Sequence, residues 1–229
     1  MIRAVIFDLD GTLYDRYSSL RAAAYQLHSE HRNWFPESMI AKELGRQLVK
    51  FDHRYNYFGG WPSVAEKLKT ANVLLPEVDD REFGEAAISA MAESLVPYPF
   101  TLKMLADLRR KGYRLGMITN GTPEVQWRKL RKLGLENQFE TVLVSGAVGA
   151  EKPDPAIFQA CEKAMDLPGR EMVYVGDNPE LDILGAYNGG FTPIWVKTSV
   201  GWGFPDIRRA PYEINDVSEL DDLLDRISG

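Results

Sequence analysis

The sequence has almost no cysteine and no long hydrophobic run. Cys161 is the single cysteine among 229 residues, so the chain cannot form an internal disulfide framework. No apolar run approaches the roughly 20 residues that a transmembrane helix needs. The apolar stretch at Ala4–Phe7 is too short for a signal-peptide core and is followed by Asp8. We therefore expect a cytoplasmic protein with no membrane partner.

An excess of basic charge is also missing. The chain has 33 acidic and 27 basic residues and a formal net charge of −6. Nucleic-acid binding proteins usually present a basic face, so we expect no nucleic-acid partner. A substrate that carries phosphate would have to be attracted locally, by a lysine, a metal ion or helix N-termini.

What the sequence does contain is an alternation of short apolar runs and amphipathic stretches. The expected strands are Ala4–Phe7, Tyr113–Ile118, Thr141–Val144, Met172–Val175 and Phe191–Val196. The expected helices between them are Phe100–Lys111, Pro123–Leu133, Pro155–Met165 and Glu180–Asn188. In the first of these helices we assign Leu102, Leu105 and Leu108 to the apolar face. The alternation predicts an α/β fold with a doubly wound, Rossmann-like parallel sheet.

One interval has helix patterns but no convincing strand. It predicts helices at Ser18–His31, Pro36–Phe51, Trp61–Lys69 and Asp80–Leu95. A gap this long is too large for a loop in a compact domain. We therefore expect an α-helical cap subdomain at residues 16–96, inserted into a catalytic core formed by residues 1–15 and 97–229.

Polar residues follow the expected strands where each one ends. They are Asp8-Leu9-Asp10-Gly11-Thr12, Thr119-Asn120-Gly121, Glu151-Lys152-Pro153-Asp154 and Gly176-Asp177-Asn178, with Asp182 five residues after Asp177. Each piece alone is a common turn or cap signal. Ligands bind at the carboxyl ends of parallel strands, however, and four such pieces at successive strand ends indicate one site. Clustered carboxylates repel one another, and Mg²⁺ suits an all-oxygen site of this kind.

These four pieces, in this order, resemble the signature motifs of the haloacid dehalogenase-like hydrolase superfamily. The resemblance covers nearly the whole chain, including a helical cap inserted after the first motif. It implies a Rossmann-like core and phosphoryl transfer through an aspartyl-phosphate.

The resemblance also implies a role for each motif residue. Asp8 would be the nucleophile, and Asp10 would act first as acid and then as base. Thr119, with backbone amides of Asn120 and Gly121, would hold the phosphoryl oxygens, and Lys152 would neutralise charge. The set expected to bind Mg²⁺ consists of the Asp8 carboxylate, the Asp10 backbone carbonyl and the Asp177 carboxylate, with Asp182 in support.

Activities within the superfamily differ at the second aspartate. Dehalogenases and phosphonatases lack the counterpart of Asp10, so its presence favours phosphate substrates. Phosphosugar mutases keep both aspartates and remain an alternative, although Gly11-Thr12-Leu13 looks more like a phosphatase. The expected function is Mg²⁺-dependent hydrolysis of a small phosphomonoester, such as a nucleoside monophosphate or sugar phosphate. The protein would act as a monomer or homodimer.

The aromatic-rich stretch from Asp52 to Trp61 bears on substrate choice. Arg54 could meet an anionic group and Tyr55 or Tyr57 could stack on a base or sugar. The alternative, which we favour, is that these aromatic residues pack the helices of the cap. We also expect His28 and His31 to be packing or surface residues.

A different class of function is a phospho-acceptor or binding module without turnover. Response-regulator receiver modules also place an acceptor aspartate, a threonine and a lysine around Mg²⁺. They are about half this length and lack both an inserted cap and a counterpart of Asp10. Steady turnover of p-nitrophenyl phosphate with Mg²⁺ separates these classes.

Overall fold

The structure is a computed structural model that describes residues 1–52, 57–198 and 201–228. Within them the chain forms two compact units. One consists of Met1–Tyr14 and Pro97–Gly229 and is called the core unit; the other is Asp15–Val96 and is called the helical unit. None of the helices in the described residues combines the length and apolar character that crossing a membrane requires.

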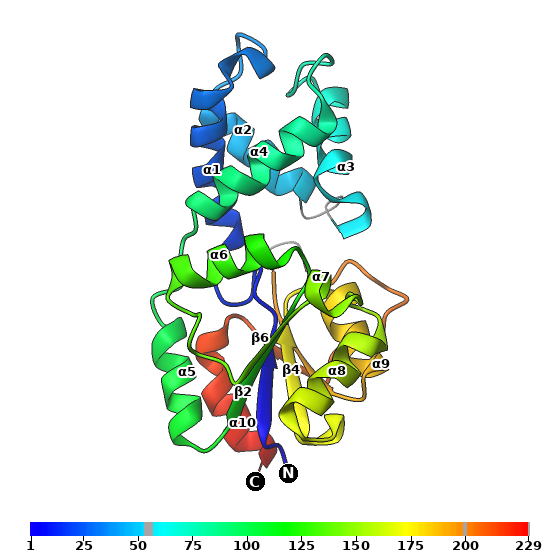
Figure 1. The fold of residues 1–229 in the computed structure, drawn as a ribbon. Coiled ribbons are helices and arrows are strands. Elements are labelled where there is room, and N and C mark those ends of the chain that lie inside the picture. Colours follow the sequence, from blue (N-terminus) through cyan, green and yellow to red (C-terminus); the bar gives the residue numbers. More distant parts are fainter. Residues whose placement is uncertain (53–56, 199–200, 229) are drawn as a thin grey trace. The chain divides into compact units, whose positions relative to one another are not determined.

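The core unit is built on a parallel sheet whose strand order is β3-β2-β1-β4-β5-β6 (Figure 1). The strands are β1 (Ala4–Phe7), β2 (Arg114–Thr119), β3 (Thr141–Val144), β4 (Met172–Gly176), β5 (Thr192–Val196) and β6 (Tyr212–Ile214). Five of them lie at the expected places, and the doubly wound fold is confirmed. The short edge strand β6 was not predicted, because three residues carry too little periodicity to distinguish a strand from a loop.

The helices of the core unit lie on both faces of the sheet. They are α5 (Thr101–Arg110), α6 (Pro123–Leu133), α7 (Ser145–Val148), α8 (Pro155–Met165), α9 (Gly185–Asn188) and α10 (Leu220–Ser228). Short turns are η3 (Gly169–Glu171), η4 (Pro179–Leu184) and η5 (Val217–Glu219). In Figure 1, α5 and α10 cover one face and α8 and α9 cover the other.

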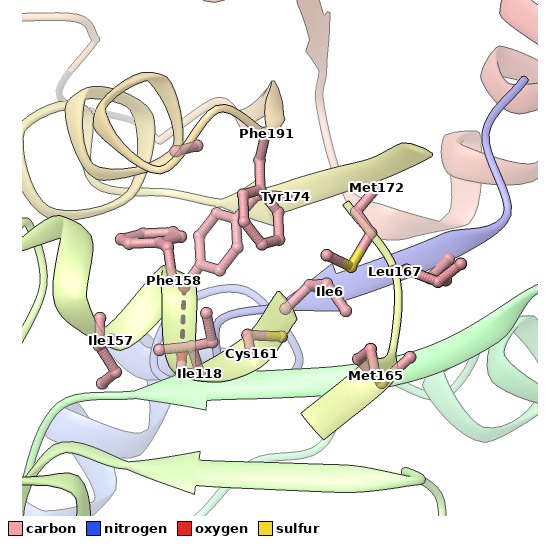
Figure 2. Packing of buried hydrophobic residues seen from close by; sticks show 12 residues of the cluster. Ile6, Ile118, Ile157, Phe158, Cys161, Met165, Leu167, Met172, Tyr174 and Phe191 are labelled. Atoms are coloured by element: carbon pink, nitrogen blue, oxygen red, sulfur yellow. Dashed lines mark hydrogen bonds between the residues drawn. The ribbon is translucent and has the colours of Figure 1, made fainter. Parts of the chain in front are cut away.

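A hydrophobic cluster joins α8 to the sheet (Figure 2). Phe158 and Cys161 of α8 are fully buried against Ile6 of β1 and Tyr174 of β4. The Phe158 ring meets that of Tyr174 edge to face, with ring centroids 5.2 Å apart. The cluster fixes the side of the sheet from which α8 and the preceding loop, which carries Lys152, approach the strand ends.

Two of the four helices expected in the core unit differ from the prediction, and α7 and α10 were not predicted. The segment expected to be a helix at Glu180–Asn188 begins as the π-helical turn η4, in which the Ile183 N–H donates to the Asn178 carbonyl, and continues as α9. The Asn178 side chain caps this turn by accepting from two backbone N–H groups. Leu102 is 49% exposed, so its assignment to the apolar face of α5 is wrong. Met104, Leu105 and Leu108 form that face instead, because Leu102 lies about 100° from their stripe.

The helical unit contains α1 (Arg16–Glu30), η1 (Arg32–Trp34), α2 (Ala41–Phe51), α3 (Tyr57–Thr70) and α4 (Asp80–Glu93). The side chains of Asp15 and Asp79 cap α1 and α4 by accepting hydrogen bonds from backbone N–H groups of the first turn. α2 begins five residues later than predicted, because Ile40 before it is extended. α3 is interrupted at Gly60, whose φ of 63° is outside the helical region.

His28 of α1 and His31, which directly follows that helix, pack within the helical unit, as expected. The His28 ring contacts the Met39 carbonyl oxygen at 2.9 Å, and the His31 ring stacks on Trp34. Trp61 is buried and packs against Phe83, in keeping with the expectation that the aromatic-rich stretch packs helices. The other hypothesis for this stretch is that Arg54, and Tyr55 or Tyr57, contact substrate. Arg54, Tyr55 and the side chain of Tyr57 lie outside what the structure describes.

Candidate active site

The site lies at the carboxyl ends of β1, β2 and β4. Asp8 directly follows β1, Thr119 is the last residue of β2, and Asp177 directly follows β4. Because these strands are parallel neighbours in the sheet, their ends meet at one edge. The Asp8 N–H donates to the Val175 carbonyl oxygen at 2.9 Å, which fixes the start of the loop that carries Asp10.

Lys152 connects two carboxylates at the centre of the site. Its Nζ lies 2.6 Å from Asp8 Oδ1 and 2.7 Å from Asp182 Oδ1, and its side chain is only 3% exposed. The Tyr174 hydroxyl, 3.0 Å from the same Nζ, donates in turn to the Ile118 carbonyl oxygen. Burial of two carboxylates is tolerable here because one ammonium group is hydrogen-bonded to both.

The electrostatics of Asp8 follow from this burial. Removal from water, together with the negative charges of Asp182 and Asp10, raises the pKa of Asp8 from its usual 3.8 to about 7, against the lowering effect of Lys152. Interaction with Asp182 and Asp8 holds the pKa of Lys152 well above its usual value even though burial opposes this. The site therefore carries an excess of negative charge that one lysine does not fully compensate.

Three carboxylates of the site could hold a metal ion. Asp8, Asp177 and Asp182 each offer one oxygen, and the three oxygens lie within 4.8 Å of one another. Gly11, with φ of 89°, lies against the Asp177 carboxylate, where an added Cβ would be 2.5 Å from Asp177 Oδ2. The glycine therefore lets the loop after β1 approach Asp177 closely. Oxygen donors of this kind suit a hard divalent cation.

The loop residues after β2 make hydrogen bonds that connect different parts of the site. Asn120 braces the Lys152 backbone, accepting from its N–H at 2.9 Å and donating to its carbonyl oxygen at 3.0 Å. The Gly121 N–H, expected to bind a phosphoryl oxygen, donates to Ser145 Oγ at 3.0 Å. In this structure, then, the Asn120 side chain positions Lys152, and the Gly121 N–H connects β2 to α7.

Asp10 is held by side chains that sequence reasoning missed. Its Oδ1 accepts from Lys129 Nζ at 2.6 Å and from the Tyr14 hydroxyl, and its Oδ2 accepts from Gln126 Nε2 at 2.9 Å. Gln126 and Lys129 lie on α6, on the same inward stripe as Leu130 and Leu133. A glutamine and a lysine in a stripe that is otherwise leucine were a usable signal for a polar partner inside the core unit.

Comparison with known proteins identifies the family. The haloacid dehalogenase-like hydrolase family matches residues 2–190. The chain is 32% identical to glyceraldehyde 3-phosphate phosphatase of Methanothermobacter thermautotrophicus over an alignment of 239 positions, which covers 97% of each chain. It is 34% identical to pyrimidine 5′-nucleotidase YjjG of Escherichia coli over 230 residues, or 96% of each chain.

A similar fold occurs in the putative hydrolase YfnB of Bacillus subtilis, whose crystal structure has bound magnesium. The TM-score is 0.82 at 21% identity, with 97% of this chain and 98% of that chain covered. This likeness concerns the fold, whereas the match over residues 2–190 and the two phosphatase relatives establish the family. The chain belongs to the haloacid dehalogenase-like hydrolases and is an enzyme of the hydrolase class.

Proposed function

We propose that this hydrolase removes phosphate from small phosphomonoesters through an aspartyl-phosphate on Asp8, with Mg²⁺ as its cofactor. The observation that carries the proposal is the pairing of two acids at one strand end. Asp8 is buried with Lys152 at 2.6 Å, and Asp10, two residues later, has a separate set of hydrogen-bond donors. Two carboxylates in different surroundings suit two different tasks, nucleophile and proton carrier.

The reaction divides into two displacements at phosphorus. In the first, an Asp8 oxygen bonds to phosphorus while the ester bond breaks, and Asp10 gives a proton to the departing alcohol oxygen. In the second, Asp10 takes a proton from water as the water oxygen bonds to phosphorus and the bond to Asp8 breaks. Lys152 offsets negative charge on Asp8, and the Thr119 hydroxyl orients a phosphoryl oxygen.

The donor set supports Mg²⁺ at this site. The Asp8 and Asp177 carboxylates and the Asp10 backbone carbonyl would hold the ion, with Asp182 in support through its contact with Lys152. When bound, it would supply positive charge to the carboxylates and to the phosphoryl oxygens. The close approach of Gly11 to Asp177 supports this assignment, because only glycine leaves room for it.

The substrate we propose is a nucleoside monophosphate or a sugar phosphate. The names of the two phosphatase relatives support this class, one referring to a triose phosphate and the other to pyrimidine nucleotides. We further propose that the helical unit serves as the cap that decides among such substrates. A panel of phosphomonoesters, compared by kcat/KM, identifies the preferred member.

The test of the proposed reaction is turnover of p-nitrophenyl phosphate with Mg²⁺. We expect sustained turnover that EDTA abolishes and that added Mg²⁺ restores. Asp8→Asn should lose several orders of magnitude in kcat while the fold remains, because an amide is not a nucleophile here. Asp166→Asn, at an exposed position, is the matched control and should keep wild-type rates. Full activity in EDTA contradicts the metal assignment, and normal turnover by Asp8→Asn contradicts the nucleophile.

A further inference from the structure

Asp10 is held at both carboxylate oxygens by one face of α6. Lys129 Nζ donates to Oδ1 at 2.6 Å and Gln126 Nε2 donates to Oδ2 at 2.9 Å. The two donors are three residues apart, about one turn of helix, so they project from the same side. Because each oxygen has its own donor, the carboxylate is restrained both in position and in rotation about its last torsion.

Gln126 also connects Asp10 to the residue expected to hold the phosphoryl group. Its amide nitrogen carries two hydrogens and donates to Asp10 Oδ2 and to Thr119 Oγ1. A single amide thus sets the spacing between the proton-carrying carboxylate and the hydroxyl at the end of β2. Tyr14 donates to Oδ1 from the same loop that carries Asp10.

Gln126 and Lys129 are polar side chains buried in the core unit, where apolar side chains would pack at a lower free-energy cost. Gln126 is 1% exposed and Lys129 is 7% exposed, although both residue types are usually at the surface. They occupy the buried stripe of α6 together with Leu130 and Leu133, where apolar side chains would satisfy the packing alone. A helix that needed only to cover the sheet would have no reason to bury a glutamine and a lysine against an aspartate.

We propose that Gln126 and Lys129 are positioning residues for proton transfer by Asp10. This inference rests on the proposed phosphatase reaction and extends it to residues of α6. Lys129 and Gln126 hold the Asp10 carboxylate where its proton reaches the ester oxygen as the phosphorus–oxygen bond breaks and the bond to Asp8 forms. They hold it at the same place when it takes a proton from the attacking water.

The test compares kcat and KM of Lys129→Met, Lys129→Arg and Gln126→Met with wild type. Methionine has nearly the length of either side chain but donates no hydrogen bond. We expect kcat of the methionine variants to fall by about 10²-fold with KM within about twofold, the behaviour of lost orientation at the reacting centre. Lys129→Arg, which keeps a charged donor, should recover part of the loss. Arg131→Met, on the exposed side of α6, is the matched control and should match wild type.

The dependence on leaving group separates positioning of Asp10 from a merely structural role. In single turnovers, an alkyl phosphate should lose more rate in Lys129→Met than p-nitrophenyl phosphate does, because p-nitrophenolate hardly needs a proton. Equal losses for the two substrates overturn the inference. So does an unchanged kcat with a lowered melting temperature, or a raised KM alone, which would make Lys129 a substrate-binding cation.

The inference and the proposed function fail in different ways. If wild-type protein with Mg²⁺ turns over no phosphomonoester, both are overturned. If wild type turns over p-nitrophenyl phosphate and alkyl phosphates while Lys129→Met and Gln126→Met keep wild-type rates on both, the phosphatase stands and the positioning role is refuted.

Discussion

Lys152 shows how much of the site depends on one side chain. Its ammonium group contacts Asp8, Asp182 and Tyr174, and its side chain is buried. The simplest sequence interpretation of a lysine before a proline is a solvated loop residue, and burial excludes that interpretation. Breaking a buried charged pair leaves an uncompensated charge and is strongly destabilising.

We predict that Lys152→Met loses both activity and stability. The free energy of unfolding should fall by about 3–5 kcal/mol, because Asp8 and Asp182 would then be buried without their shared cation. In the double variant Lys152→Met/Asp182→Asn one of these charges is removed, so stability should partly return while kcat stays low. Urea unfolding and p-nitrophenyl phosphate assays on the same samples check this. Unchanged stability in Lys152→Met would show that Lys152 is not the cation that compensates Asp8 and Asp182.

At this scale the sequence predicted the motif residues but not their partners. Asp8, Thr119 and Asp177 could be named because they lie at strand ends, and Lys152 because its loop leads on from the β3 strand, positions that topology makes significant. Gln126 and Lys129 could not be assigned partners, because a contact such as Lys129 to Asp10 spans more than a hundred residues. The sequence analysis predicted the helix α6 but did not assign Gln126 or Lys129 to its buried side, where the structure places them.

Among the elements, α6 and α8 were predicted with their observed bounds. Both begin with a capping side chain followed by proline, Thr122-Pro123 and Asp154-Pro155, and these are strong local start signals. The start of η4 was displaced because a π-helical turn has no sequence period of its own. The start of α2 was displaced because Pro36 is compatible with either a helix N-terminus or a loop.

The C-terminus of α6 gives a prediction about backbone conformation. Gly134 has φ of 67°, and an added Cβ there would meet no atom within 4 Å. The cost of a side chain is therefore conformational rather than steric with neighbours. Gly134→Ala should lower the free energy of unfolding by about 1 kcal/mol, and Gly134→Asn should lose less because asparagine tolerates the left-handed region. Urea denaturation of both variants tests this, and an alanine variant as stable as wild type would contradict it.

The whole molecule has a net charge of −6, so attraction of a phosphate group to the site depends on a few buried cations there. Within the described residues of the core unit, Lys152 and Lys129 have their ammonium groups against Asp8 and Asp10. Their placement supports local attraction of phosphate, as the sequence suggested. The sequence identified only Lys152 as a cation of the site, and the structure adds Lys129. The two-unit division also places all the motif residues in the core unit.

The raised pKa of Asp8 predicts how pH and metal act together on stability. Burial raises this pKa from 3.8 to about 7, so the folded chain binds the Asp8 proton more tightly than the unfolded chain does. Without metal, the contribution of Asp8 to stability should therefore decrease by a few kcal/mol as pH rises from about 4 to about 7. Mg²⁺ bound at Asp8, as proposed, would compete with that proton, so its stabilising effect should increase over the same range.

Melting temperatures with and without Mg²⁺ test this linkage. The increase caused by Mg²⁺ should be small at about pH 5 and reach a plateau above about pH 7. In Asp8→Asn the pH dependence of the increase should be largely lost. An equal effect of Mg²⁺ at both ends of the range would contradict a metal site that includes the Asp8 carboxylate.

The most direct test of the account is to find the phosphoryl group on Asp8. Wild-type protein and Asp10→Asn are mixed with labelled phosphomonoester and Mg²⁺, quenched in acid within one turnover, and digested for mass spectrometry. We predict a phosphoryl group on the peptide that contains Asp8. It should accumulate more in Asp10→Asn with p-nitrophenyl phosphate, because the water that hydrolyses the intermediate would lack its general base. Catalytic turnover with Asp8 unmodified at every quench time, or with the label on another residue, would contradict the account.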